Sequence, residues 1–290
     1  MQKKIIIKKS QKELWMWRII FLITVSYLYS SKFSNNTQEI KENCIVRTKL
    51  YGDIFYDDDV LSKIEYLKNN DNIKGVLVEV NSGGGEITAS EALYRAFYEL
   101  KEKKPVIASI KSVGASGAYM AIMSANKIFA YETSAIGSIG VMMEGFVDFS
   151  SLAEKIGIKF YNYKSSPLKA IPNNFEKPTE EGNASMQKFV NQQKEIFKNM
   201  LINSRLNVKD IEQATNGEIF TGNKALELHL IDAIGTERDA LNDLKNNHNL
   251  KTYLTVIDYD IINFQENSNG FMSHVKSFLI TLQHYKLYTY

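Results

Sequence analysis

The alternation of short apolar runs with helical segments is the feature that most constrains how this chain can fold. Residues 75–80 and 105–110 are apolar enough to form buried strands, and residues 87–100 between them carry apolar side chains at helical spacing. Strands that alternate with helices are typical of a layered α/β domain with a largely parallel sheet. We therefore predict an α/β fold with such a sheet for the body of the chain.

The rest of the chain continues this pattern less regularly. Short strands are expected at residues 127–130, 140–143 and 158–163, and a last strand at residues 252–257. A long helix is expected over residues 180–202, where apolar residues recur at helical spacing. These elements extend the predicted α/β domain well beyond its first strands.

Composition and patterning divide the 290 residues into four segments. Residues 1–31 form a basic N-terminal region with an apolar run, and residues 32–43 form a polar tether. The main domain is predicted over residues 44–257, a length that can bury one sizeable core. The tail, residues 258–290, contains an amphipathic helix expected over residues 271–282, and its role is open.

The apolar run that begins at Ile19 follows six lysines and arginines. It is short for a membrane-spanning helix, which needs about 20 residues, but no cleavage site of small residues closes it. Flanking aromatic residues and Arg18 suit a membrane interface. We therefore predict an uncleaved single-pass anchor rather than a cleaved signal peptide or a buried core helix. Basic residues before the anchor predict that the main domain lies on the outer side of a cytoplasmic membrane.

Charge and cysteine content exclude several classes of protein. The net charge is +2, and after residue 18 there are 29 lysines and arginines against 32 acidic residues, so nucleic-acid binding has no electrostatic support. Cys44 is the single cysteine, which rules out an intrachain disulfide and a thiolate metal site. The four histidines lack the spacing of a zinc helix. We therefore predict neither a metal nor a cofactor.

Two glycine-rich turns follow the two buried strands. Residues 81–86 (Asn-Ser-Gly-Gly-Gly-Glu) follow the first strand, and residues 112–117 (Ser-Val-Gly-Ala-Ser-Gly) follow the second. Ligands bind at the carboxyl ends of parallel strands, so we expect the two turns to lie side by side at one site. The glycines at 83–85 lack the pattern of a phosphate-binding loop or a dinucleotide fingerprint.

Ser116 is a candidate nucleophile because it lies at the first turn of an expected helix, where unpaired N–H groups stabilise negative charge. The N–H group of Gly84 or Gly85, together with that of Gly117, would form an oxyanion hole with two donors. One such donor contributes about 3–4 kcal/mol in acyl transfer. The simpler interpretation of Ser116 is a helix N-cap.

A serine nucleophile also needs a base. All four histidines lie in the last quarter of the chain, in segments that look peripheral. A lysine can serve when burial disfavours its charged form, and Ser/Lys pairs are a known variant of the catalytic triad. The residue pattern alone does not select one lysine among many.

At these motifs the chain resembles the signal peptide peptidases of the SppA type, a family of membrane-anchored serine peptidases with a Ser/Lys dyad. The resemblance extends from about residue 45 to residue 235. It implies a Clp-protease/crotonase-like layered fold with repeated β-β-α units, preceded by an N-terminal membrane segment. The motifs that carry it are Asn81-Ser82-x-Gly84-Gly85, Ser112-x-Gly114-Ala115-Ser116-Gly117, Gly137-Ser138-Ile139-Gly140-Val141, Lys164-Ser165-Ser166-Pro167-Leu168-Lys169 and Phe220-Thr221-Gly222.

Carried over by position, the resemblance implies roles for individual residues. Ser116 matches the nucleophile, Lys169 the general base, and Ser138 the serine that keeps the lysine neutral and oriented. The glycine donors named above match the family's oxyanion hole. Lys164 is a competing candidate for the base.

The resemblance also implies a function and partners. It predicts a membrane-tethered serine endopeptidase that hydrolyses peptide bonds in released signal peptides or other unfolded apolar segments, outside a bacterial cytoplasmic (inner) membrane. In single-domain members of the family, subunits form a ring in which the lysine reaches the serine of a neighbour, so a homo-oligomer is implied. Two alternatives stay open: a catalytically silent, membrane-anchored scaffold or peptide-binding ring, and a crotonase-type acyl-CoA enzyme.

Four positions depart from the family pattern. Gly83 stands at a usual proline, and Ala118, Ser166 and His229 stand at usual glycines. None of the four is a reacting group. The departures therefore concern rate and substrate preference more than the type of reaction.

Overall fold

The computed structural model divides the chain into two units, Met1–Ile40 and Lys41–Tyr290, and the fold below belongs to the second. No helix among the described residues is long and apolar enough to cross a membrane. Apart from Arg18, the predicted anchor lies outside the described residues, as does the helix expected over residues 271–282. The described residues are 18, 39–143, 146–248, 250 and 254–262.

Strands and helices alternate along the chain, as expected from the sequence. The strands are β1 (Cys44–Ile54), β2 (Ile73–Gly85), β3 (Val106–Ala115), β4 (Lys127–Ala130), β5 (Ala135–Gly137), β6 (Ile219–Phe220), β7 (Ala233–Ile234) and β8 (Thr255–Asp258). The helices are α2 (Asp58–Asn69), α3 (Ile87–Lys103), α4 (Gly117–Ile122), α5 (Ser150–Lys155), α6 (Glu180–Ser204), α7 (Ile211–Ala214), α8 (Gly222–Glu227) and α9 (Glu237–Asn247).

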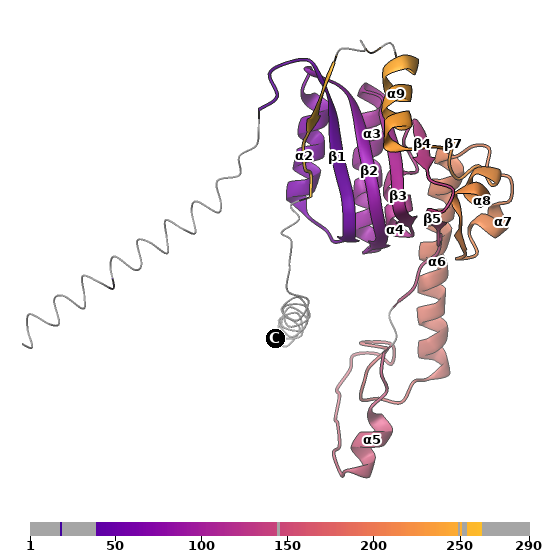
Figure 1. The fold of residues 1–290 in the computed structure, drawn as a ribbon. Coiled ribbons are helices and arrows are strands. Elements are labelled where there is room, and N and C mark those ends of the chain that lie inside the picture. Colours follow the sequence, from indigo (N-terminus) through magenta and orange to yellow (C-terminus); the bar gives the residue numbers. More distant parts are fainter. Residues whose placement is uncertain (1–17, 19–38, 144–145, 249, 251–253, 263–290) are drawn as a thin grey trace, which may run out of the picture. The chain divides into compact units, whose positions relative to one another are not determined.

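β3 is the central strand of the sheet that the described residues form. It pairs in parallel with β2 on one side, and on the other side with β4 along its first half and with β5 at its end. The strand order β6-β5-β3-β2-β1-β8 is parallel except for the antiparallel pair of β5 and β6 (Figure 1). The predicted α/β fold, with a largely parallel sheet and repeated β–α units, is therefore confirmed.

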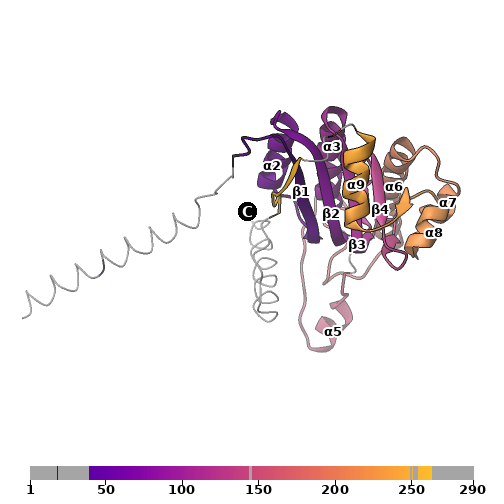
Figure 2. The same ribbon diagram turned by 45° about the horizontal axis from the view of Figure 1, so that its top comes forward.

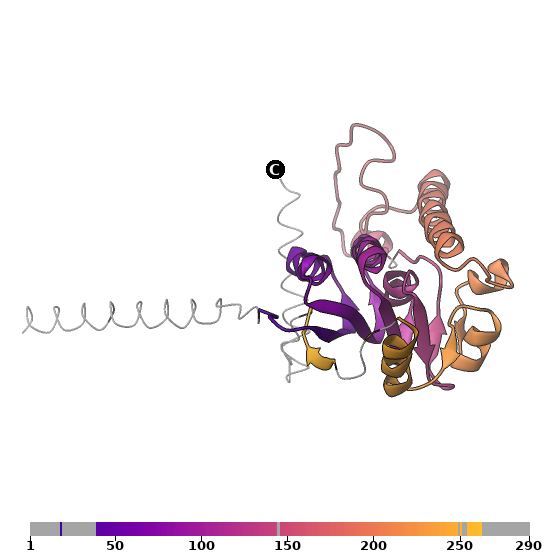
Figure 3. The ribbon, with the colours of Figure 1, turned by 90° about the horizontal axis from the view of Figure 1, so that it is seen from above.

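Helices cover both faces of this sheet. α2 and α3 lie on one face and α9 on the other (Figure 3), where α9 packs over the central strands (Figure 2). Ala240 and Leu244 of α9 form a buried cluster with Ile45, Leu77 and Ile107 from three adjacent strands. A parallel sheet that is buried on both faces requires central strands that are almost wholly apolar, and this explains the apolar runs.

A charged network ties the first turn of α9 to the sheet. The Glu237 carboxylate pairs with Arg47 at 2.6 Å and with Lys111 at 2.7 Å, and the Tyr51 hydroxyl donates to Glu79 at 2.9 Å. Burial raises the pKa of Glu79. A hydrogen bond from Glu79, together with the pairs to Lys111 and Arg47, lowers the pKa of Glu237 to about 2. The network therefore keeps Glu237 ionised between two cations, and burial makes Glu79 the weaker acid of the two.

Residues 141–178, between β5 and α6, form an arm that projects away from the sheet and carries α5 (Figure 1). α6 returns the chain to the body, where Phe197 and Leu201 are buried. The strands expected at residues 140–143 and 158–163 are wrong, because these residues pair with no strand. Their large side chains stay exposed instead of joining the core, as with Met142 at 81% and Tyr163 at 97% exposure.

Candidate active site

The two glycine-rich turns lie against each other at the carboxyl ends of β2 and β3. Ser82 is opposite Gly114 in the strand register. A Cβ added to Gly84 would lie 2.7 Å from the Gly117 nitrogen and 3.0 Å from the Ser116 Cβ. Only a residue without a side chain allows so close an approach, so glycine at position 84 is a steric requirement. The expected adjacency of the turns is confirmed.

Ser116 adopts an unusual backbone conformation between β3 and α4. Its φ of 51° and ψ of −124° are rare for a residue with a side chain and cost on the order of 1–3 kcal/mol. Its N–H donates to the Gly137 carbonyl at 2.8 Å, and its carbonyl accepts from Met120 at 3.0 Å. Its hydroxyl makes no capping hydrogen bond to the helix. Ser116 is therefore the N-cap residue of α4 by position, as the simpler interpretation expected, but its side chain does not cap the helix and capping does not explain the backbone strain.

Gly85, rather than Gly84, has the N–H group that is the candidate donor beside Gly117. The Gly84 N–H already donates to the Oγ of Ser82 at 3.1 Å. Gly85 is opposite Ile54 in the parallel ladder, and Glu86 donates to the Ile54 carbonyl at 2.9 Å. In a parallel ladder this pattern turns the N–H of Gly85 itself away from β1. A Cβ added to Gly117 would lie 3.2 Å from the Gly85 nitrogen, so the two backbone nitrogens are neighbours.

Two buried serines support these turns, and sequence reasoning did not assign either a role. Ser82 is 2% exposed and accepts the Gly84 N–H. Ser90, at the start of α3, donates to the Glu86 carbonyl at 2.9 Å, and its Oγ would lie 2.2 Å from a Cβ added to Gly117. Ser82 belongs to the first glycine motif, which is the one signal that could have pointed to it.

Ser138 lies beside Ser116 because β5 runs parallel to the end of β3. Ala115 is opposite Gly137, so Ser138 and Ser116 are the next residues of the two strands. Ser138 also has a positive φ, 49°, and its N–H donates to the Glu218 carbonyl at 2.6 Å. The structure therefore places Ser138 next to the candidate nucleophile.

Lys169 lies on the arm, exposed to solvent, and the structure does not bring it to Ser116. The backbone N–H of Lys169 donates to the Ser166 carbonyl at 3.1 Å within a turn. Lys164, the competing candidate, forms an ion pair with Glu176 on the same arm. Within one chain, the glycines and the two serines are together and the proposed base is apart from them.

A cavity of about 690 Å³ opens at Ser116. Its walls come from the glycine turns, α4, α6 and the start of the arm. No lysine, arginine or histidine lines it within the described part of the chain, and the same part holds no cluster of three or more possible metal ligands. The lining residues are Asp53, Phe55, Gly83, Gly84, Gly85, Glu86, Ile87, Ser116, Gly117, Met120, Gly140, Val141, Met142 and Phe197.

Residues 230–232, which follow α8, hold α4 in place through buried polar contacts. The hydroxyl of Tyr119, a fully buried residue, donates to the Leu230 carbonyl at 2.6 Å, and burial raises the pKa of Tyr119 so that it stays neutral. Arg205, whose side chain is 8% exposed, pairs with Asp232 at 2.8 Å. Asp232 also accepts the Ile128 N–H at 2.7 Å and so connects this segment to β4. The strained turn at Ser116 is thus held on a rigid support.

Comparison with known families decides the identity of this fold. A model of peptidase family S49 matches residues 98–251, more than half of the chain, and a model of Clp protease matches residues 32–137. The chain belongs to peptidase family S49. The resemblance predicted from the motifs is confirmed.

Known relatives of this S49 chain are described as proteases. It is 35% identical over 215 residues to a candidate signal peptide peptidase SppA of Enterococcus faecium, covering 73% of this chain and 60% of that one. It is 34% identical over 212 residues to a candidate protease of Methanocaldococcus jannaschii, covering 73% and 67%. It is 30% identical over 201 residues to the chloroplastic serine protease SPPA of Arabidopsis thaliana, covering 69% and 30%. The S49 chain therefore spans less than two thirds of the length of the first relative.

A solved structure is also similar to the S49 chain. It is a mutant of the membrane-bound stomatin-specific protease 1510-N, with a TM-score of 0.49 and 14% identity. The similarity covers 76% of this chain and 99% of that one.

Proposed function

We propose that the protein is a serine endopeptidase in which Ser116 attacks the carbonyl carbon of a peptide bond. The observation that carries this proposal is the approach of the two glycine turns, which gathers the Ser116 side chain and the Gly85 and Gly117 nitrogens at one cavity. Two backbone donors beside a serine can stabilise the oxyanion of a tetrahedral intermediate. Such donors need no metal and no cofactor, in line with the prediction from the sequence.

In the proposed mechanism, Lys169 in its neutral form is the general base. It takes the proton of the Ser116 hydroxyl as Oγ attacks, and the negative charge that develops on the carbonyl oxygen is stabilised by the Gly85 and Gly117 N–H groups. The protonated lysine then donates to the leaving amine, which yields an acyl-enzyme on Ser116. Water hydrolyses this ester by the same steps, and the serine is regenerated.

We propose further that the lysine is supplied by a neighbouring subunit in a homo-oligomeric ring. The position of Lys169 on an exposed arm supports this, because its own Ser116 lies at another part of the same body. The arm also exposes large apolar side chains, including Tyr161 and Tyr163, which burial against a partner would remove from water. In the ring, the Ser138 hydroxyl, beside Ser116, would orient the Nζ of the incoming Lys169. It would accept a hydrogen bond from the ammonium form or donate one to the neutral amine.

For the substrate and location, we propose released signal peptides or other unfolded apolar segments at the outer face of a bacterial cytoplasmic membrane. Apolar walls from Phe55, Met120 and Met142 in the Ser116 cavity suit apolar side chains. The name of the Enterococcus faecium relative agrees with this substrate class. The anchor proposed over residues 1–31 rests on the basic residues that precede its apolar run.

A serine-reactive phosphonate probe tests the proposal on the full-length protein in detergent. We expect the probe to label Ser116, with loss of labelling in both Ser116→Ala and Lys169→Ala, while Lys164→Ala is labelled normally. Failure to label Ser116 in a folded, oligomeric protein would refute the peptidase.

Mixing the two inactive variants tests the origin of the lysine. A one-to-one exchange of Ser116→Ala with Lys169→Ala subunits should restore about a quarter of the sites, because each site takes one residue from each of two neighbours in a heterologous ring. A mixture as inactive as its parts, after proven subunit exchange, would place the two residues in one chain.

The silent scaffold is the second candidate, and the separation of Lys169 from Ser116 within one chain is the observation that favours it. A silent scaffold would bind peptides, but the phosphonate probe would not label its Ser116. The acyl-CoA enzyme has less support, since the described residues that line the Ser116 cavity offer no cation to the phosphates of CoA.

A further inference from the structure

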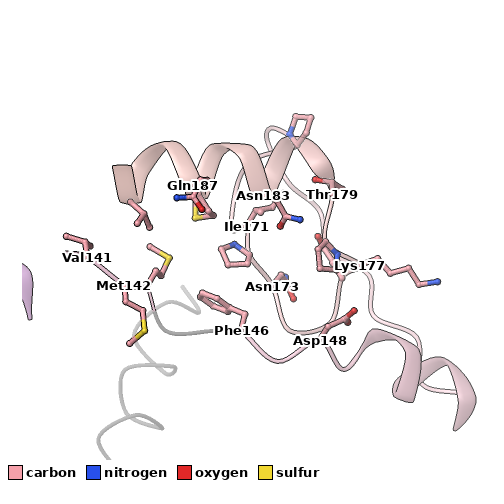
Figure 4. Close-up of a pocket in the computed structure, with 17 residues that line it drawn as sticks. Val141, Met142, Phe146, Asp148, Ile171, Asn173, Lys177, Thr179, Asn183 and Gln187 are labelled. Carbon is pink, nitrogen blue, oxygen red and sulfur yellow. The ribbon is translucent and has the colours of Figure 1, made fainter. Parts of the chain in front are cut away.

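Figure 4 shows a second cavity, of about 680 Å³. It lies between the arm and the N-terminal half of α6. Val141 and Met142 line both cavities. The two cavities therefore share this short segment as a common wall.

The walls of this second cavity are apolar and adaptable. Met143, Phe146 and Ile171 come from the arm, and Met186 and Val190 come from α6. Figure 4 shows Met142, Phe146 and Ile171 below the helix, on the side of the arm. Methionine side chains adjust to apolar groups of different shapes, so this surface suits a variable ligand.

The polar groups at the same cavity suit a peptide backbone rather than an anion. Asn173, Asn183 and Gln187 line it, and amide side chains can pair with both the N–H and the C=O groups of a chain. The Glu176 carboxylate is already paired with Lys164. Asp148 adds a second carboxylate, and Lys177, the one cation among the described lining residues, is offset by a contact to Glu154 at 3.7 Å, so the lining charges do not favour a phosphate or a sulfate.

Internal packing holds the cavity open and preformed. A Cβ added to Gly182 in the first turn of α6 would lie 2.7 Å from Cγ2 of Ile171, so the arm rests closely on the helix. Thr179 accepts the Gly182 N–H at 3.1 Å and caps α6. Further out, the rings of Phe160 and Phe175 stack at 4.1 Å and stiffen the arm. A preformed cavity loses less conformational entropy when it binds a ligand.

We propose that this cavity is a second substrate site, which binds an apolar segment of the peptide at a distance from the bond that is cut. The proposal rests on the proposed peptidase function and adds a requirement for the substrate: an apolar run beside the cleavage site in addition to suitable residues at it. The shared wall of Val141 and Met142 and the amide-bearing rim favour a peptide as the occupant. A neighbouring copy of the chain is the competing occupant, and the test below separates the two.

Binding to full-length Ser116→Ala protein tests the proposal without requiring catalysis. Two fluorescent peptides share a common core and carry an extension of about six residues, which spans about 20 Å when extended. One extension consists of leucine and valine, and the other of serine and asparagine. We expect the apolar peptide to bind about tenfold more tightly or better, as burial of one large apolar side chain would produce. Equal affinity for the two peptides would overturn the proposal.

Substitutions on α6 then locate the binding. Met186→Lys and the milder Met186→Gln should reduce the preference for the apolar peptide to less than about twofold, because each puts a polar group in the apolar wall. Phe189→Lys is the matched control, since Phe189 is on the same helix, 44% exposed, and outside the cavity lining. It should keep the full preference. A full preference in both Met186 variants would overturn the proposal.

Two further measurements separate the alternatives. If Met186→Gln dissociates the oligomer in sedimentation and the parent shows no peptide preference, the cavity is a subunit interface and the proposal is wrong. Cleavage of both peptides by the unmodified protein at equal kcat/KM would also refute the second site while supporting the peptidase. Preferential binding of the apolar peptide without any cleavage would refute the peptidase and leave the second site intact.

Discussion

Alanine substitutions at two adjacent glycines, Gly83 and Gly84, should have opposite consequences for the candidate active site. Gly84 has a φ of 110°, where a side chain is strained by about 1–3 kcal/mol. A Cβ there would also lie 2.7 Å from the Gly117 nitrogen, and such crowding costs about 1–3 kcal/mol more. We expect Gly84→Ala to lower the free energy of unfolding by about 2–6 kcal/mol.

The same substitution should reduce catalysis by more than its effect on stability suggests. To restore an ordinary contact of 3.4 Å, the two turns must part by about 0.7 Å. That displacement removes the Gly117 N–H from its position beside Gly85, and the loss of one oxyanion donor lowers kcat by about 10²–10³-fold.

Gly83→Ala is the matched control for this prediction. A Cβ at Gly83 would meet no atom within 4 Å, and its φ lies outside the left-handed region. We expect it to retain kcat, with any change confined to KM because Gly83 borders the cavity, and to gain about 0.4–1 kcal/mol from the stiffer unfolded chain. Urea unfolding and steady-state peptide cleavage measure both effects. Equal kcat values and equal unfolding free energies for the two variants would refute the reasoning.

Three further predictions concern the support of the site. Glu237→Gln should lower the free energy of unfolding at pH 7 and have little effect near pH 2, because a pKa lowered from 4.5 to about 2 contributes stability that is lost as the pH falls through that range. Urea unfolding at both pH values checks this, and an equal effect at both would contradict it. Arg205→Met should cost about 1.5–3 kcal/mol in urea unfolding because the charge-assisted bond between the buried guanidinium and Asp232 is lost, whereas Lys224→Met at a surface pair should cost under about 1 kcal/mol. Tyr119→Phe should lower the unfolding free energy by about 1–3 kcal/mol through the unpaired Leu230 carbonyl, and an unchanged midpoint would argue against that bond.

The parallel sheet and the meeting of the two glycine turns could be predicted from sequence because both follow from local signals. Residues 75–80 and 105–110 are apolar without alternation, as buried parallel strands must be. Parallel strands end at one edge of the sheet, so the turns that follow them become neighbours. The sequence therefore correctly predicts that Ser116 and Gly117 lie near Gly84 and Gly85.

The choice between Gly84 and Gly85 could not be made from sequence. It depends on which carbonyl Glu86 pairs with, which the register between β1 and β2 sets, and on the capture of the Gly84 N–H by the Ser82 side chain within β2. The positive φ of Ser116 and Ser138 is similarly a tertiary effect, since neither residue type demands it.

The arm was predicted incorrectly because its apolar residues resemble those of strands. Ile158 and Phe160 have high strand propensity, but a strand also needs a neighbour to pair with, and the arm has none from the described residues. Apolar patterning shows that a side chain avoids water, and it does not distinguish the core of one chain from a surface shared between chains.

Because Ser116 lies on the body and Lys169 on the arm, assembly of the subunits would have to precede activity. If the base comes from a neighbour, an isolated chain carries every reacting group and still cannot hydrolyse a peptide bond. Specific activity then depends on dilution: it falls when subunits are scarce and rises steeply as they meet. Any tether that raises the effective concentration of subunits would therefore raise the specific activity without a change in any reacting group.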